Sequence, residues 1–332
     1  MRALVTGGAG FIGSHLVEHL LGLGHEVVVL DDFSTGSAGN LAHVADAVTA
    51  VQGSILDEDA LELATKGCDT VFHLAAAVGV HTIVNRPMES LRRNLLGTDA
   101  VLEAARRHAG RLLLASSSEI YGKNIKDNLD EDDDRILGSP LKSRWSYAAA
   151  KGLDELMGYW CWREYELGVV IVRPFNVVGP RQSGTYGMVV PNLVAQALHG
   201  RPLTLYGDGT QRRCFCAVGD VIPAFVALVQ DERAHGQAFN LGSAEEVTMH
   251  QLAERVLHVT GSDSPIVHVP YDRAYEPGFE DMARRCPDTT RARELIGFRA
   301  RTRLDDIIAS VVAEQRESLA KDAVGVGTGE AR

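Results

Sequence analysis

Two side chains that can move a proton stand four positions apart in the chain. Tyr147 and Lys151 belong to the segment SYAAAKGLDELMGYW, whose pattern predicts a helix, so both project from one helical face. An ammonium group beside a phenol favours the phenolate and lowers the pKa of the tyrosine toward the working pH. The spacing therefore predicts that Tyr147 acts as a general base with Lys151 as its partner.

Hydroxyl and carboxylate groups follow a short apolar segment upstream of this pair. RLLLA, residues 111–115, predicts a buried strand, and Ser116, Ser117, Ser118 and Glu119 come directly after it. Open α/β sheets bind their ligands at the carboxyl ends of the strands. A serine hydroxyl at this edge could therefore bond a hydroxyl group of a substrate.

A glycine pattern near the N-terminus indicates a dinucleotide site. Gly7, Gly10 and Gly13 lie between the predicted strand RALVT and an amphipathic helix, where bare backbone can approach a pyrophosphate. The next strand, HEVVVL, ends at Asp31, whose carboxylate would accept bonds from the adenine-ribose hydroxyls. Residues 32–56 contain no Lys or Arg, so a ribose 2′-phosphate would meet a carboxylate and no cation. NAD is thus favoured over NADP, and Lys151 could hold the nicotinamide ribose.

The elements that must position these groups alternate between apolar strands and helical patterns through the first half of the chain. Strands are expected near residues 2–7, 25–31, 69–76, 111–118 and 169–176, with helices near 11–24, 94–108 and 146–168. Strands that are apolar throughout are buried on both faces. The prediction is an α/β protein with a Rossmann-type doubly wound parallel sheet and a smaller C-terminal α/β lobe. The expected divisions are an NAD-binding domain at 1–176, a mainly substrate-binding lobe at 177–318 with segments that return to the sheet, and a loose tail at 319–332.

Composition excludes several other classes of protein. The 332 residues are 45% hydrophobic and carry a net charge of −11, from 33 Lys and Arg against 44 Asp and Glu. An acidic surface repels nucleic acid and anionic lipid, and no apolar run is long enough to span a membrane. A cytoplasmic location is expected. The five cysteines form no metal or redox motif and are predicted to be reduced, packed thiols. The acidic run 130–134 is predicted to be a solvated loop without a metal, and Asp57 a helix cap.

The motifs together resemble the extended short-chain dehydrogenase/reductase family of nucleotide-sugar epimerases, dehydratases and decarboxylases. The matching segments are VTGGAGFIGSHL, HLAA at 73–76, the stretch from Asn94 to Thr98, SSSEIYG, the Tyr147 and Lys151 pair, RPFNVVGPR at 173–181 and RRCPD at 284–288. The resemblance implies Ser117 as the catalytic serine, and GSILD departs from the family at Ser54. The implied cofactor contacts are Gly7, Gly10, Phe11, Ile12, Gly13, Asp31, Asp32, Ser54, Ile55, Leu74, Ala75, Ala76, Asn94, Tyr147 and Lys151. The implied contacts with a UDP-linked sugar are Asn176, Val190, Asn192, Leu205, Arg213 and Arg285.

Three segments narrow the expected reaction. SSSEIYG, KSRWSYAAAK and QRRCF followed by YEPGFEDMARRCPD resemble the UDP-glucuronate decarboxylases. That resemblance implies oxidation at carbon 4 to a β-keto acid, loss of carbon dioxide to give a UDP-pentose, and roles for Ser118, Glu119 and Arg285 in positioning and protonation. One alternative is a UDP-hexose or UDP-hexuronate 4-epimerase, in which the reaction requires no further acid at the position of Glu119. The other is a catalytically silent NAD sensor. The resemblance also implies a homodimer.

Overall fold

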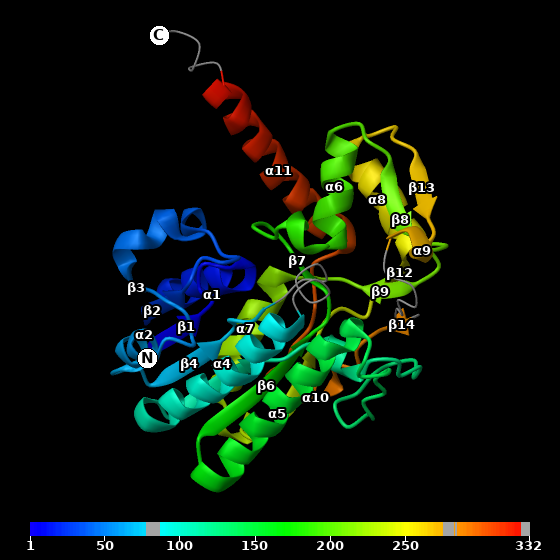
Figure 1. Ribbon diagram of the computed structural model, residues 1–332. Helices are drawn as coiled ribbons and strands as arrows, with labels where there is room; N and C mark the ends of the chain where they lie inside the picture. The colour runs from blue at the N-terminus through cyan, green and yellow to red at the C-terminus, as the bar shows by residue number, and fades with distance from the viewer. Residues whose placement is uncertain (78–86, 275–281, 283, 327–332) are drawn as a thin grey trace.

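A seven-stranded parallel sheet forms the centre of the protein in the computed structural model (Figure 1), which describes residues 1–77, 87–274, 282 and 284–326. The strand order is β11-β6-β5-β4-β1-β2-β3. The chain builds outward from β1 through β2 and β3, and then from β4 on the opposite side of β1. The order therefore reverses between β1 and β4, the place where doubly wound sheets bind ligands. The predicted fold class is confirmed.

The main sheet and its helices account for most of the first half of the chain. The strands are β1 (Arg2–Thr6), β2 (Glu26–Asp31), β3 (Val48–Gln52), β4 (Thr70–His73), β5 (Arg111–Ala115), β6 (Gly168–Pro174) and β11 (Ala238–Leu241). The helices are α1 (Phe11–Gly22), α2 (Glu58–Thr65), α4 (Pro87–His108), α5 (Ser146–Tyr165), α7 (Val218–Gln230) and α10 (Thr290–Ile296). The short 3-10 turns are η1 (Ala38–Ala47), η2 (Ser118–Tyr121), η3 (Ser143–Trp145) and η5 (Glu232–Ala234).

Burial on both faces explains why the central strands are apolar throughout. One core packs Val5, Val29 and Phe72 against helices that include α1 and α7. The opposite core packs Leu4, Val28 and other residues against α2, α4 and α5. Alternate residues of a strand point to opposite faces, so each strand needs apolar side chains at successive positions.

The C-terminal half forms a second lobe over the carboxyl ends of the strands (Figure 1). Its strands are β7 (Val177–Val178), β8 (Leu203–Tyr206), β9 (Arg212–Cys214), β10 (Cys216–Ala217), β12 (Glu246–Thr248), β13 (Ile266–Val269) and β14 (Arg284–Arg285). Its helices are α6 (Val189–Leu198), α8 (Met249–Thr260), α9 (Tyr271–Ala274) and α11 (Leu304–Val326), with the turn η4 (Gly184–Tyr186). Helices α6, α8 and α11 share their own apolar core. Strand β11 pairs with β6, so the chain returns to the main sheet from this half.

Several local expectations were incomplete or wrong. Strand β3 was missed because it is an edge strand whose half-exposed residues form no apolar run. Helix α11 continues to Val326, so residues 319–326 are helical where a loose tail was expected; a helix that begins on a packed core can extend past its apolar residues. Asp57 caps α2 through a bond from the Ala60 amide, as predicted. Within the described residues, no helix is long and apolar enough to cross a membrane.

The acidic run and the cysteines had different outcomes. Glu131 is buried and accepts a hydrogen bond from the Asn240 amide at 2.7 Å, so the prediction of a wholly solvated loop is wrong for that residue. No group of acidic, histidine or cysteine side chains in the described part of the chain could hold a metal ion. All five cysteines are buried and none forms a disulfide, which confirms the prediction of reduced, packed thiols.

Candidate active site

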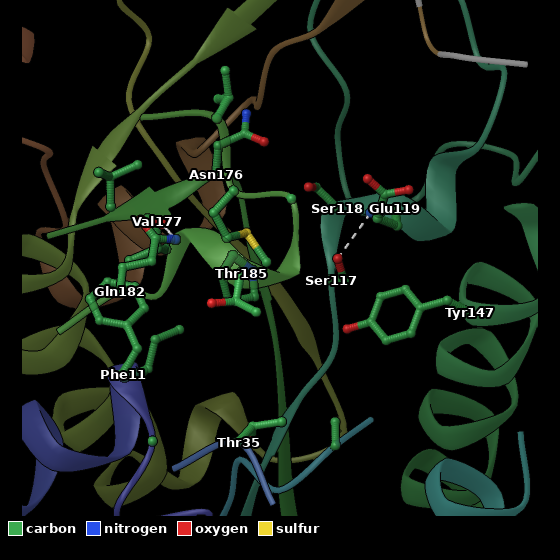
Figure 2. Close-up of a pocket in the computed structure, with 18 of the residues that line it drawn as sticks. Phe11, Thr35, Ser117, Ser118, Glu119, Tyr147, Asn176, Val177, Gln182 and Thr185 are labelled. Carbon is green, nitrogen blue, oxygen red and sulfur yellow. Dashed lines mark hydrogen bonds between the residues drawn. The ribbon is translucent and has the colours of Figure 1, made fainter. Parts of the chain in front are cut away.

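One large cavity opens at the carboxyl ends of the strands and is closed on the other side by the second lobe. Its volume is about 1530 Å³. Pockets for drug-sized ligands have volumes of roughly 300–1000 Å³, so this cavity has room for more than one such ligand. Its wall runs from the glycine loop past Ser117 and Tyr147 to Asn176 and the turn at Gln182 and Thr185 (Figure 2).

The glycine loop leaves space that side chains would fill. Gly7 has a φ of +71°, which favours glycine, and a Cβ there would lie 2.9 Å from the Ala75 nitrogen. A Cβ at Gly13 would lie 2.1 Å from the Gly7 carbonyl oxygen. Helix α1 begins at Phe11 with Gly10 as its N-cap, and no side chain caps it. The loop therefore presents bare backbone and a positive helix end to the cavity, which fits a pyrophosphate.

The end of β2 supplies carboxylates beside this loop. Asp31 is buried and accepts bonds from the amides of Ala9 and Phe33 at 2.9 and 2.8 Å. Burial raises the pKa of Asp31, and those two amide bonds oppose the rise. The expectation that no cation lies here is wrong. Arg93, from α4, bonds the Ser34 hydroxyl at 2.9 Å and pairs with Asp32 at 3.3 Å.

Most of the predicted cofactor contacts line the cavity. The lining residues among them are Gly7, Gly10, Phe11, Ile12, Gly13, Asp31, Asp32, Ser54, Ile55, Leu74, Ala75, Ala76, Tyr147 and Lys151. Asn94 does not line it. The Asn94 side chain accepts a bond from the Ala77 amide at 2.8 Å and donates to the Ala77 carbonyl, so it fixes the segment after β4 from behind the wall.

Tyr147 and Ser117 face the same part of the cavity from α5 and from the end of β5. The Tyr147 hydroxyl points into the cavity beside Ser117 (Figure 2). Burial is the largest cause that raises the pKa of Tyr147, and the charges of Glu119 and Asp154 raise it further. The predicted lowering of this pKa is therefore wrong.

The contacts of Lys151 explain part of the reason why the pKa of Tyr147 is not lowered. Its ammonium donates to the Ala115 carbonyl at 3.0 Å and pairs with the buried Asp154 at 3.2 Å. Asp154 thus neutralises the charge that was expected to favour the phenolate. The lysine instead fixes the first turns of α5 against the end of β5.

A cluster of charges lies next to this pair. Glu119 accepts one hydrogen bond from Arg144, at 2.6 Å, and another from Arg285 on its second oxygen. The side chains of all three are at least four-fifths buried. Burial alone would raise the pKa of Glu119, but the two arginines outweigh it and hold this pKa at about 2. Glu119 is therefore a carboxylate at every working pH and no proton donor in this arrangement.

The remaining predicted substrate contacts line the outer half of the cavity. They are Asn176, Val190, Asn192, Leu205 and Arg213; Arg285, the sixth predicted contact, lines the inner wall with Ser118 and Glu119. Asn176 has a φ of +39°, and its side chain accepts a bond from Arg285 at 2.5 Å and donates to the Cys214 carbonyl at 2.7 Å. Strand β14 pairs with β9, which brings Arg285 beside Arg213. Residues 275–281 and 283, within one of the quoted motifs, lie outside the described residues.

Sequence reasoning missed two basic residues of the site. Arg144 stands three positions before Tyr147, inside a segment that the resemblance had already singled out, so a helical spacing could have placed it on the same wall. Arg93 precedes Asn94 and carries no local signal, because only the packing of α4 beside the end of β2 brings it to Asp32.

A buried network supports the turn that holds Glu119. Tyr121, at the end of η2, donates to the Asn240 side chain at 2.7 Å and accepts from Arg173 at 2.9 Å. Arg173 also binds both oxygens of Glu155 on α5, at 2.9 and 2.6 Å. The network ties η2 to α5 and β11, so the two walls that carry Glu119 and Tyr147 are fixed to each other.

A doubly wound sheet with a glycine cradle and a carboxylate at the end of its second strand defines a dinucleotide-binding protein of the Rossmann class. Comparison with known proteins is more specific. The model of the NAD dependent epimerase/dehydratase family matches residues 3–242. The chain belongs to this family, and its cofactor is NAD.

Individual relatives cover almost the whole chain. It is 41% identical over 300 residues to the UDP-N-acetyl-alpha-D-glucosaminuronate decarboxylase of Bacillus cytotoxicus, covering 90% of this chain and 92% of that protein. It is 34% identical to UDP-glucuronic acid decarboxylase 1 of Arabidopsis thaliana, covering 98% of this chain and 72% of that one. The crystal structure of UDP-glucuronic acid 4-epimerase from Bacillus cereus, with UDP-glucuronic acid and NAD, superposes with a TM-score of 0.86 at 27% identity, covering 96% of this chain and 100% of that one.

Proposed function

We propose that this protein decarboxylates a UDP-linked hexuronate, with UDP-glucuronate as substrate, through a 4-keto intermediate to a UDP-pentose. The observation that carries the proposal is the cluster of Glu119, Arg144 and Arg285 beside Tyr147 and Ser117. The decarboxylase relatives support it. Inversion at carbon 4 requires no charged group beyond the base, whereas a substrate with a carboxylate next to the reacting carbon needs cations there.

The residues of the inner wall have separate tasks in this reaction. Tyr147 accepts the proton of the carbon-4 hydroxyl, and Ser117 holds that hydroxyl by a hydrogen bond. Bound NAD supplies the hydride acceptor and a positively charged ring. The resulting ketone is β to the carboxylate, so the bond between carbons 5 and 6 breaks, carbon dioxide leaves, and the electron pair forms an enolate that a proton then quenches at carbon 5.

The ionisation of Glu119 limits which residue can supply that proton, and the other residues of the cavity have binding tasks. Glu119, with a pKa of about 2, is ionised and serves to position the two arginines. Arg285 and Ser118 lie on the same wall, where they can hold the ring. In the outer half, Arg213 and Asn192 would hold the diphosphate and nucleotide of the substrate, as the resemblance implies. On the cofactor side, the glycine loop would hold the pyrophosphate and Asp31 the adenine ribose.

The test is incubation of the purified protein with NAD and UDP-glucuronate labelled with ¹³C at carbon 6. Labelled carbon dioxide and a UDP-pentose by NMR would support the proposal, and NADH absorbance would separate a released 4-keto sugar from a reduced UDP-xylose. UDP-N-acetylglucosaminuronate is the second substrate to try, because a relative is named for it. An unchanged carbon count would contradict decarboxylation.

The alternative is a 4-epimerase that acts on the same kind of sugar, and the similar Bacillus cereus structure favours it as the second candidate. UDP-galacturonate with full retention of the label would establish it. Glu119→Gln discriminates further: a decarboxylase loses most of its carbon dioxide release, whereas an epimerase loses little turnover. A Tyr147→Phe variant that kept its full biological effect would instead support an NAD sensor.

We also propose a homodimer that forms through α4 and α5, which pack side by side. Leu96 on α4 and Leu153, Leu156 and Trp160 on α5 are exposed apolar side chains. Sedimentation velocity should show a dimer for the wild-type protein and a monomer for Leu156→Lys. Leu23→Lys, an equally exposed position beyond α1, is the matched control and should stay dimeric. The cytoplasmic location remains a prediction.

A further inference from the structure

Two thiols from distant parts of the chain meet beside the substrate side of the cavity. The Sγ atoms of Cys214 and Cys286 lie 3.2 Å apart, and the Cys214 thiol donates a hydrogen bond to Cys286. Both residues are buried, with exposed fractions of 0% and 4%, and both are reduced. They are 72 positions apart in the sequence, so the fold alone makes them a pair.

The pairing of two strands explains why these thiols meet. β9 and β14 run parallel with Arg213 opposite Arg285, and Cys214 and Cys286 are the next residues along the two strands. Neighbouring strands lie about 4.8 Å apart, and residues at the same register point to the same face. A disulfide requires Cα atoms about 4.4–6.8 Å apart. The backbone therefore suits a disulfide, and the sulfurs need to approach each other by only about 1 Å.

The hydrogen bond between the thiols makes them chemically unequal. Because Cys214 donates to it, the pKa of the Cys286 thiol is lowered. The same bond, together with burial, raises the pKa of Cys214. The thiolate is the form of cysteine that reacts with oxidants. Cys286 is therefore the sulfur that reacts first, and Cys214 is in contact with it to form the second bond.

We propose that Cys214 and Cys286 form a reversible disulfide when the protein meets a hydroperoxide. With hydrogen peroxide, the Cys286 sulfur attacks one oxygen, the O–O bond breaks, and Cys286 becomes a sulfenic acid while one water leaves. The Cys214 sulfur then attacks the Cys286 sulfur, the S–O bond breaks, and the Cys214 proton leaves with the hydroxide as a second water. The thiols lose two electrons, which the peroxide gains. A dithiol reductant reverses the change by thiol–disulfide exchange.

The residues beside the two cysteines connect this site to the cavity. Arg213 and Arg285 directly precede the cysteines and line the cavity. The Cys214 carbonyl accepts a hydrogen bond from Asn176 at 2.7 Å, and Asn176 accepts one from Arg285 at 2.5 Å. Drawing the sulfurs together therefore moves the backbone that positions both guanidinium groups. The contact of these arginines with a UDP-linked ligand rests on the proposed function.

Peptide mapping tests the bond directly. The purified, NAD-loaded protein is treated with hydrogen peroxide, its free thiols are blocked with N-ethylmaleimide in denaturant, and trypsin cuts immediately before each cysteine, after Arg213 and Arg285. Mass spectrometry should find the two fragments joined with the loss of two hydrogen atoms, and dithiothreitol should separate them. Cys216 lies on the same fragment as Cys214, so Cys216→Ser is the matched control and should keep the cross-link. Cys286→Ser should abolish it.

The effect on the cavity is measured with UDP, which binds without turnover. Calorimetric titration should show that the oxidised protein binds UDP about three- to tenfold more weakly than the reduced protein, because hydrogen bonds from charged groups depend on geometry. NAD affinity should stay unchanged, since the glycine loop is built from other segments. Dithiothreitol should restore UDP binding, and Cys286→Ser should bind UDP equally before and after peroxide.

A disulfide switch is ruled out if peroxide leaves both thiols free, if it oxidises Cys286 without joining it to Cys214, or if the cross-link forms and UDP affinity does not change. Neither measurement requires decarboxylation. If the protein releases no carbon dioxide but the cross-link forms and weakens UDP binding, the switch stands and the decarboxylase assignment is wrong. If carbon dioxide is released and no cross-link forms, the decarboxylase assignment stands and the switch is wrong.

Discussion

The cofactor half and the reaction half of the cavity are built in different ways. The glycine loop and the start of α1 occupy residues 7–13, and Asp31 ends the next strand. The cluster around Tyr147 instead brings together η2, η3, α5 and β14, with Glu119 and Arg285 separated by 166 positions. The first half is a property of contiguous backbone, whereas the second exists only when the chain is folded.

This difference determines how each half should respond to substitution. The glycine loop depends on the absence of side-chain atoms, so an added Cβ should disrupt the loop. The charged residues of the other half should stay in place. In the charged cluster, opposite charges stabilise one another, so removing one side chain changes the energies of the remaining charges. Four predictions separate the two halves.

The largest effect is expected at the base. Tyr147→Phe removes only the hydroxyl that accepts the substrate proton, so kcat should fall by about 10²–10⁴, the usual contribution of a general base. NAD binding should stay close to the wild-type value, because the cradle is untouched. Single-turnover kinetics and NAD titration measure both quantities, and a parallel loss of NAD affinity would show that the two halves are not separable.

Gly13→Ala tests the cradle by the opposite change. The added Cβ would lie 2.1 Å from the Gly7 oxygen and 2.8 Å from the Gly8 Cα, both backbone atoms that cannot move aside. The free energy of unfolding should fall by more than about 3 kcal/mol, with loss of NAD binding. Gly22→Ala, at the end of the same helix with nothing within 4 Å, should stabilise the protein by up to about 1 kcal/mol. Urea denaturation compares the two.

The charged cluster should give a distinctive pH dependence of stability. Its arginines lower the pKa of Glu119 from 4.5 to about 2, so its stabilising effect is complete above pH 4.5 and is lost as the pH falls toward 2. The wild-type protein should exceed Glu119→Gln in unfolding free energy on the order of 2 kcal/mol above pH 4.5, with the difference shrinking in acid. A constant difference across that range would contradict the assignment of the charge to Glu119.

The smallest effect is expected at the edge of the cofactor half. Arg93 donates to the Ser34 hydroxyl and pairs with Asp32. Arg93→Met should leave the Kd for NAD within about threefold and weaken NADP by about three- to tenfold, because one cation less faces a 2′-phosphate. Fluorescence titration with both cofactors measures the ratio, and an unchanged ratio would mean that Arg93 does not face that phosphate.

Prediction from the sequence succeeded where the residues of one short segment are enough to determine its structure. The parallel sheet follows from strands that are apolar on both faces, and the predicted cofactor residues lie along one cavity, with Asn94 behind its wall. It failed where neighbours in space decide the outcome. Lys151 was expected to lower the pKa of Tyr147, but Asp154 neutralises its charge and burial raises that pKa.

The sequence by itself determined the buried strands and main helices of the first half, the glycine cradle and the Tyr147 and Lys151 pair, because backbone geometry and helical spacing act over a few residues. Only the tertiary structure decided which charges meet. It placed Arg144 and Arg285 on the two oxygens of Glu119, and Arg93 beside Asp32. Electrostatic interactions act through space, so the charge of a site depends on packing between segments that no local pattern relates.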